Sequence, residues 1–516
     1  MTAVAVPTPR MPVLRVSALP TWTVGASAAV TAGARLPFLG HAASPDEAGF
    51  LLVGAQWHGA GASLYGRYWV DRPPLLITIF RAAAELGGLT ALRLIGCLAV
   101  ALVVLGSARA AGLIGGASAS RWAAVTAGGL CLSPLLGGYE VNGELLAAPF
   151  ILGSVVGVIA ALRAARQNAA IARSAMAGGL AMSALLVKQN LADAVVFALV
   201  ALVLGLWRGE LTRQRFSALV AGAFSGAVGV ASLLALWTVM HGTSLLGVFD
   251  AMYPFRVRAA AVEAAGGRAH AAARLDGLVA VVAVSGLGVV LLALVCHLVV
   301  RRRHDTLTWA LVAMILFGAS SVLLGGNYWH HYLVELIPPL SIAAGVLVSR
   351  HSFAARSVVA YVLVAACVAW GVSLARPQGT DAGSVGRAIA ESSQPSDSIV
   401  TAWGNADLTF ASGLSSPYVQ LWSLPVKTID PQLTQLDAVL RGPDAPTWFV
   451  IRKHVSSWGL DTARTSSILG REYHRVGRIC GHAIFLRNGI DRPAPEVVGD
   501  CRGASTLLSM MEEIKP

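Results

Sequence analysis

Two adjacent carboxylates stand out near the start of the chain. They belong to the segment Ser44-Pro45-Asp46-Glu47, whose residue types suit the first turn of a helix, with Ser44 and Asp46 as helix caps. One interpretation is that Asp46 and Glu47 only stabilise that helix. The other is that a carboxylate here accepts a proton from a hydroxyl or amine nucleophile. Composition alone leaves both interpretations open.

A cation held in one place is predicted further along the chain. Asp71-Arg72-Pro73-Pro74 follows the aromatic segment 65–69, and an arginine between a carboxylate and two rigid prolines can bind a phosphate through paired hydrogen bonds. The alternative is an aromatic belt at a membrane surface, with the two prolines ending a helix. Under this alternative, Arg72 needs no ligand.

A second acidic site is predicted at Glu140 and Glu144. These carboxylates flank Asn142-Gly143, a pair that is also typical of an ordinary solvated turn. As a functional loop, this segment would orient an acceptor or help bind a divalent ion, and Asp71 is a further candidate for this second acidic or acceptor site. No metal ligand set can be assigned from the residue spacing.

Two further cations are candidates for phosphate binding. Lysine occurs only four times in the chain, and Lys188 stands at the predicted end of an apolar run, where snorkelling is the simple explanation. His331 follows His330 in an aromatic segment that would also serve as an interfacial belt. Adjacent histidines point in different directions, so zinc would need further ligands.

The elements that carry these residues are predicted to cross a membrane. Only 13% of the 516 residues are charged, against about 25% in soluble proteins, and the mean hydropathy is +0.66. A spanning helix needs about 20 mostly apolar residues. Eleven candidate spans are predicted, at 16–38, 90–108, 122–137, 145–162, 174–188, 191–207, 217–240, 276–300, 307–325, 333–349 and 357–375.

The orientation follows from the arginines between these spans. The net charge of +12 gathers in short connecting segments, which favours the positive-inside rule over nucleic-acid binding. With a cytoplasmic N-terminus, every inside segment holds at least two arginines. They are Arg10 and Arg15; Arg109 and Arg121; Arg163, Arg166 and Arg173; Arg208, Arg213 and Arg215; Arg301, Arg302 and Arg303; and Arg350 and Arg356.

The candidate carboxylates then lie on the outer face, together with the C-terminal region. We predict two domains, a membrane body at 1–375 and a small extracytoplasmic α/β domain at 376–516. Its strands are expected at 398–403, 447–452 and 482–486 and its helices at 385–391, 432–440 and 461–469. Cys480 and Cys501 are its only cysteines, and they can pair as a disulfide if the domain lies outside the cytoplasm.

The spacing of the first two motifs resembles a known enzyme class. Asp46-Glu47 after the first span, followed about 25 residues later by Asp71-Arg72-Pro73-Pro74, resembles the first outer loop of GT-C-type glycosyltransferases. The protein mannosyltransferase and lipid A aminoarabinose transferase families have an Asp-Glu and then an Asp-x-Lys-Pro-Pro signature. Arg72 departs from that signature, because it stands where those families have a phosphate-binding lysine. The run from His331 to Pro338-Pro339 is similar to their late donor-binding loop.

The resemblance implies an inverting glycosyltransferase of the plasma membrane. The donor would be a polyprenyl-phosphate sugar, the acceptor a glycan, lipid or protein of the cell envelope, and the catalytic carboxylate Asp46 with Glu47 beside it. Arg72, Lys188 and His331 would bind the donor phosphate. The competing hypothesis is a transporter or flippase for a lipid-linked or anionic solute, which would place ionisable groups near the middle of the bilayer.

Overall fold

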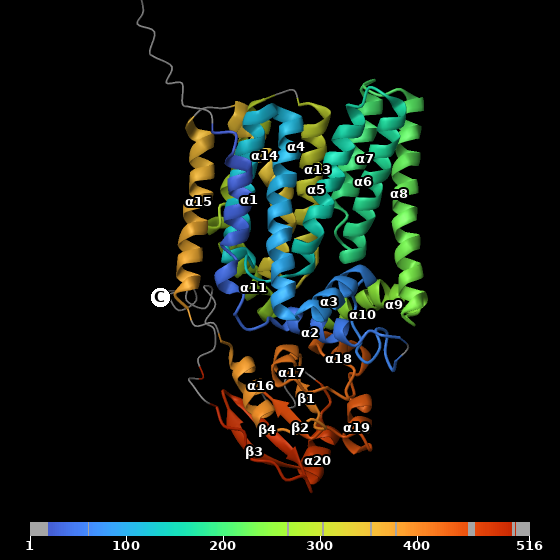
Figure 1. Cartoon of the computed structure of the whole chain (residues 1–516), viewed down its shortest axis with the longest axis vertical. Helices are drawn as coiled ribbons and strands as arrows, with labels where there is room; N and C mark the ends of the chain where they lie inside the picture. Colours follow the sequence, from blue (N-terminus) through green and yellow to red (C-terminus); the bar gives the residue numbers. More distant parts are fainter. Residues whose placement is uncertain are drawn as a thin grey trace, which may run out of the picture.

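The chain forms a bundle of long helices with a small α/β domain against one end (Figure 1). This computed structural model describes residues 19–59, 61–265, 268–301, 304–350, 353–376, 379–452, 460–497 and 501. The predicted fold class, a mostly helical membrane body followed by an α/β domain, is confirmed. Arg10, Arg15, Arg302 and Arg303 of the orientation argument lie outside the described residues.

Most bundle helices are long and apolar. Seven helices of the described chain can each cross a membrane, or eight if one bent pair counts as a span, so the protein is multi-pass, while the number eleven stays a prediction. The bundle helices are α1 (Thr23–Gly33), α4 (Leu89–Leu132), α5 (Gly143–Leu162), α6 (Gln167–Val187), α7 (Asp193–Trp207), α8 (Arg213–Met240), α11 (Arg268–Val284), α12 (Leu287–Val300), α13 (Thr306–Leu324), α14 (Ile337–Arg350) and α15 (Phe353–Leu374).

Helix α4 contains two of the predicted spans. Its backbone breaks at Gly116, where φ is +79°, a conformation that favours glycine. A Cβ on Gly112 would lie 3.1 Å from the Cβ of Ser120, eight residues later, so the chain folds back on itself there. The predicted span 276–300 is likewise divided, into α11 and α12, which meet at 69°.

The bundle has an apolar surface and a packed centre. Leu94, Leu98, Leu102 and Leu105 recur at helical spacing along α4 and are all exposed, as expected for a face toward lipid. Helix α14, by contrast, is buried along most of its length and packs mainly against α4. The membrane body therefore has its own core, independent of the lipid.

Short helices lie between the bundle and the C-terminal domain (Figure 1). They are α2 (Pro45–Ala55), α3 (Pro74–Leu86), α9 (Leu245–Met252) and α10 (Pro254–Ala265). Pro73 and Pro74 begin α3 as its N-cap and first residue, so the alternative interpretation in which they end a helix was wrong. Proline fits the first helical turn because its missing N–H has no partner there anyway.

The C-terminal domain is built on a four-stranded sheet of order β1-β2-β4-β3, with β1 parallel to β2 and the other neighbours antiparallel. Strands β1 (Ile399–Ala402), β2 (Trp448–Ile451) and β4 (His482–Arg487) match the three predicted strands. Strand β3 (Tyr473–Ile479) was not predicted. The domain's helices are α16 (Asp381–Glu391), α17 (Ala406–Ser412), α18 (Ser423–Ile429), α19 (Thr434–Arg441) and α20 (Ala463–Glu472).

Cys480 and Cys501 form a disulfide, as the sequence allowed. The bond ties the turn between β3 and β4 to a residue near the end of the chain. Cys97 and Cys131, in contrast, are buried free thiols of the bundle.

Candidate active site

Helix α2 carries the first pair of carboxylates, and a capping box fixes where it starts. The Glu47 N–H donates to Ser44 Oγ at 3.3 Å, and the Ser44 N–H donates to Glu47 Oε2 at 3.0 Å. Reciprocal bonds of this kind satisfy two helix-end donors. Asp46 consequently lies in the first turn, at the positive end of the helix dipole.

The Glu47 carboxylate is fully buried in contacts that join several segments. Its oxygens accept from Arg93 Nη2 at 3.1 Å and from the Val141 N–H at 3.1 Å. Arg93, itself 2% exposed, also donates to the carbonyl oxygens of Phe38, Leu39, His41 and Ala42. Glu47 thus connects α2 with α4 and with the chain before α5. These contacts suit a residue that holds α2 in position.

The Asp46 carboxylate is only partly buried, and it receives a hydrogen bond from the C-terminal domain. Nε1 of Trp422, the N-cap of α18, donates to Asp46 Oδ1 at 3.0 Å. Asp46 and Glu47 are neighbours in sequence, but their surroundings differ. The Glu47 carboxylate is bonded inside the bundle, and the Asp46 carboxylate lies at the junction of the two domains.

Arg72 is held by the carboxylate beside it. Its Nη1 donates to Asp71 Oδ1 at 2.9 Å, and Asp71 Oδ2 is 2.6 Å from Nη2 of Arg256 on α10. Burial lowers the pKa of Arg72, but the charges of Asp71 and then Asp46 outweigh it, so the pKa is raised above its ordinary value. Arg72 therefore stays a cation, and the charge of Asp46 acts on it.

A second ion pair joins α5 to α6. Asn142 caps α5 by accepting from the Leu145 N–H at 2.9 Å, which places Glu144 in the first turn. The Glu144 carboxylate is bonded to Lys188 Nζ, which also lies 4.5 Å from the ring centre of Tyr332. The ring of His331 packs at 4.9 Å against the same tyrosine, in a short helical segment before α14.

These groups form one charged cluster at the domain junction, which we call the junction cluster: Asp46, Asp71, Arg72, Glu144, Lys188, Arg256, His331, Tyr332 and Trp422. The charge of Glu144 acts on Arg72, so the two ion pairs are electrostatically connected. The Tyr332 ring contacts both Lys188 Nζ and the ring of His331. The chain thus brings together the predicted Asp46, Asp71, Arg72, Glu144, Lys188 and His331.

Glu140 stands apart from the ion pair of Glu144. Burial, with the charges of Glu47 and then Asp46, raises its pKa to about 8. It therefore lies on the Asp46 and Glu47 side, and the two members of the predicted second acidic site have different partners. Among the residues that the structure describes, no three His, Cys, Asp or Glu side chains are grouped to hold a metal ion.

Sequence reasoning missed Arg93, Tyr332 and Trp422. Arg93 carried a signal, because a charged residue inside an apolar run is costly and normally has a buried partner. Tyr332 and Trp422 carried none, since aromatic residues are common at membrane surfaces. Arg256 belongs to the basic segment 241–275, for which the sequence left open an anionic acceptor site or an amphipathic interfacial helix.

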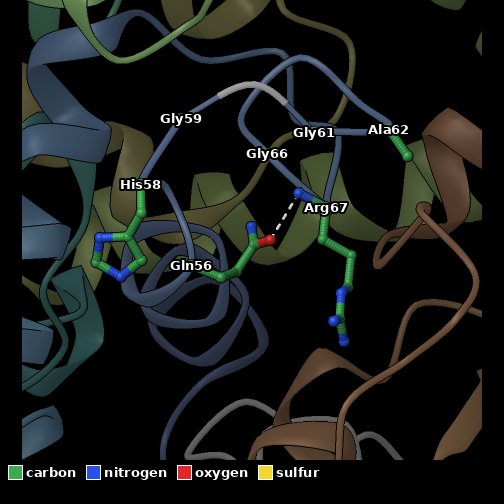
Figure 2. Close-up of a pocket in the computed structure, with 7 residues that line it drawn as sticks. All are labelled: Gln56, His58, Gly59, Gly61, Ala62, Gly66 and Arg67. Atoms are coloured by element: carbon green, nitrogen blue, oxygen red, sulfur yellow. Dashed lines mark hydrogen bonds between the residues drawn. The ribbon is translucent and has the colours of Figure 1, made fainter.

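A cavity of about 420 Å³ opens in the loop after α2. Figure 2 shows its lining, which includes Gln56, His58 and Arg67, with the Arg67 N–H bonded to Gln56 Oε1 at 2.6 Å. None of the lining residues belongs to the junction cluster. We therefore assign the candidate site to the cluster and not to this cavity.

Comparison with solved structures identifies the architecture. ArnT from Cupriavidus metallidurans bound to undecaprenyl phosphate aligns with a TM-score of 0.59 at 16% identity, over 90% of this chain and 97% of that one. The oligosaccharyltransferase AglB from Archaeoglobus fulgidus, in complex with an inhibitory peptide and a dolichol-phosphate, aligns with a TM-score of 0.53 at 11% identity, over 83% and 69%. The chain has the GT-C fold. No protein-family model and no curated protein matches the sequence.

The GT-C fold confirms the resemblance seen in the first outer loop, at the level of architecture. Identities of 11–16% show the fold alone. The chemistry of this GT-C protein therefore has to be argued from its own junction cluster.

Proposed function

We propose that this protein is an inverting glycosyltransferase that moves a sugar from a polyprenyl-phosphate carrier to an acceptor of the cell envelope. The observation that carries the proposal is the junction cluster, where a partly buried carboxylate, Asp46, interacts electrostatically with the fixed cation Arg72 in a GT-C fold. Such a pair suits a reaction that removes a proton from one group and releases an anion from another.

The donor phosphate would bind among the cations of the cluster. Arg72 is held by Asp71, and Lys188 is held by Glu144. His331 packs against Tyr332, whose ring also contacts Lys188 Nζ. Arg72 offers a planar set of donors that matches phosphate oxygens, and Lys188 adds a compact charge. The neighbouring structures bound to undecaprenyl phosphate and dolichol-phosphate support this class of ligand.

The chemistry needs one proton transfer and one displacement. Asp46 accepts the proton of the acceptor hydroxyl or amine, whose lone pair attacks the anomeric carbon from the face opposite the phosphate. The bond between that carbon and the phosphate oxygen breaks, and the lipid phosphate leaves with the electron pair. Arg72, Lys188 and His331 stabilise the charge that develops on it. A single displacement inverts the anomeric centre.

Glu47 would act through position and not by contact with substrate. Its oxygens are taken by Ser44, Arg93 and Val141, so it keeps the first turn of α2 in place. In the same way, Asp71 would hold Arg72 and Glu144 would hold Lys188.

We further propose that the junction cluster faces the outside of the plasma membrane, with a cytoplasmic N-terminus. The C-terminal domain lies at the same end of the bundle as α2, α3, α9 and α10 (Figure 1), which supports a shared outer location for the predicted acidic loops and this domain. The donor would then enter from the outer leaflet.

Donor binding is tested by native mass spectrometry of protein purified in mild detergent. Wild type should retain a polyprenyl-phosphate sugar, and Arg72→Ala should lose it because the phosphate loses its fixed cation. Arg258→Ala is the matched control, since this arginine pairs with Asp250 on the exposed surface. If wild type binds no such lipid even when it is added, the donor assignment is wrong.

A further inference from the structure

The C-terminal domain is tied to the membrane body by an extended segment. The Trp69 N–H donates to the carbonyl oxygen of Val419 at 3.1 Å, and the Ser416 N–H donates to the hydroxyl of Tyr68 at 2.9 Å. Trp69 and Gln420 form a parallel bridge. Segment 415–422 is therefore paired with the loop that precedes Asp71, which aims its last residue, Trp422, at α2.

Trp422 is packed tightly against α2. Its ring centre lies 5.2 Å from that of Phe50, and a side chain on Gly49 would collide with the indole. Gly49 is thus the residue that lets the ring approach the helix. The indole is held on two sides, by the ring of Phe50 and by the backbone at Gly49.

This packing fixes the direction of the indole N–H, which is bonded to Asp46 Oδ1 at 3.0 Å. An indole N–H donates and cannot accept, so it satisfies one carboxylate oxygen without competing for the proton. Within the described part of the chain, Asp46 receives no other hydrogen bond from a side chain. Oδ2 thus remains for another donor.

We infer that Trp422 is a positioning residue of the active site, supplied by the C-terminal domain, which orients Asp46 so that Oδ2 receives the acceptor proton. This inference rests on the proposed function. It gives the C-terminal domain a direct part in the reaction, because the reactive carboxylate is aligned only when segment 415–422 is docked.

The test uses Trp422→Phe in the full-length protein, with transfer to acceptor measured in detergent. The variant keeps an aromatic ring against Phe50 and removes the N–H. We expect kcat to fall by about 10- to 100-fold, the range for one hydrogen bond to a charged group, with the donor KM unchanged. Trp448→Phe is the matched control, since it removes an indole N–H bonded to Ser393 inside the same domain.

A double-mutant cycle separates positioning from general destabilisation. If Trp422 acts through Asp46, adding Trp422→Phe to Asp46→Asn should slow transfer no further. Gly49→Ala, which displaces the ring from the other side, should lower kcat like Trp422→Phe. Unchanged kcat in Trp422→Phe, or a full additional loss in the Asp46→Asn background, would overturn the inference. A wild type with no transfer activity would overturn the proposed function instead.

Discussion

Glu140 is a partly buried carboxyl group next to other negative charges, and this makes stability depend on pH. Its pKa in the folded protein is raised from 4.5 to about 8 by burial and by the charges of Glu47 and Asp46. Between these two values the folded protein binds a proton that the unfolded chain releases. The stability contributed by Glu140 is therefore present at low pH and is lost as pH rises toward about 8.

We expect Glu140→Gln to be more stable than wild type at pH 8 to 9, with a difference that vanishes near pH 5. Thermal unfolding in detergent at several pH values measures this. Glu85→Gln is the control, and it should be less stable than wild type at these pH values. The reason is that the hydrogen bond from Arg81 lowers the pKa of Glu85. If the difference in stability between Glu140→Gln and wild type does not change with pH, the raised pKa of Glu140 is contradicted.

At the residue scale, the sequence pointed to those members of the candidate site that lie close together along the chain. Asp46 and Arg72 were proposed because the spacing of their two segments resembles a known motif. Trp422 lies 376 positions after Asp46, and its role depends on how two domains dock, which no local pattern reports. Arg93 was visible as a lone arginine in an apolar run, but only the structure names Glu47 as its partner.

At the element scale, the Glu47 and Arg93 ion pair fixes α2 to α4. Both side chains are buried, and removing one partner leaves the other charge uncompensated, which typically costs about 3–5 kcal/mol. We expect Glu47→Gln to lower the thermal midpoint clearly. An equal midpoint for Glu47→Gln and wild type would show that the pair does not hold the helix.

The elements themselves were predictable where one physical signal dominates. Apolar length located the bundle helices, including both halves of α4. Strand β3 was missed because three of its seven residues are His or Arg, only Tyr473 is buried, and it pairs only with β4 at the sheet edge. Pro73 and Pro74 were misread because proline can stand at either boundary of a helix, and the order of the flanking elements decides which.

At the scale of the whole molecule, the Cys480–Cys501 disulfide provides a test of the proposed outer location of the C-terminal domain, because disulfides persist in oxidising compartments. In protein purified from membranes without reductant, we expect both thiols to resist alkylation until a reductant is added, as seen by peptide mass spectrometry. Alkylation of both cysteines before reduction would place the domain in a reducing compartment and contradict the proposed orientation.

The arrangement of the two domains could not be predicted from the sequence. Positive-inside counting predicted that the C-terminal domain and the acidic loops share one side, but segment 415–422 gave no sign that it would pair with Trp69. Because of that pairing, residues of both domains contribute to the junction cluster.

The most direct test of the account is the transfer activity of Asp46→Asn, measured with a polyprenyl-phosphate sugar and an acceptor from the cell envelope. Asparagine keeps the shape and removes the base, so transfer should fall by roughly 10²- to 10⁴-fold while donor lipid still co-purifies. Asp250→Asn, at an exposed ion pair, is the matched control. Full transfer by Asp46→Asn would show that this carboxylate is not the base and would contradict the proposed mechanism.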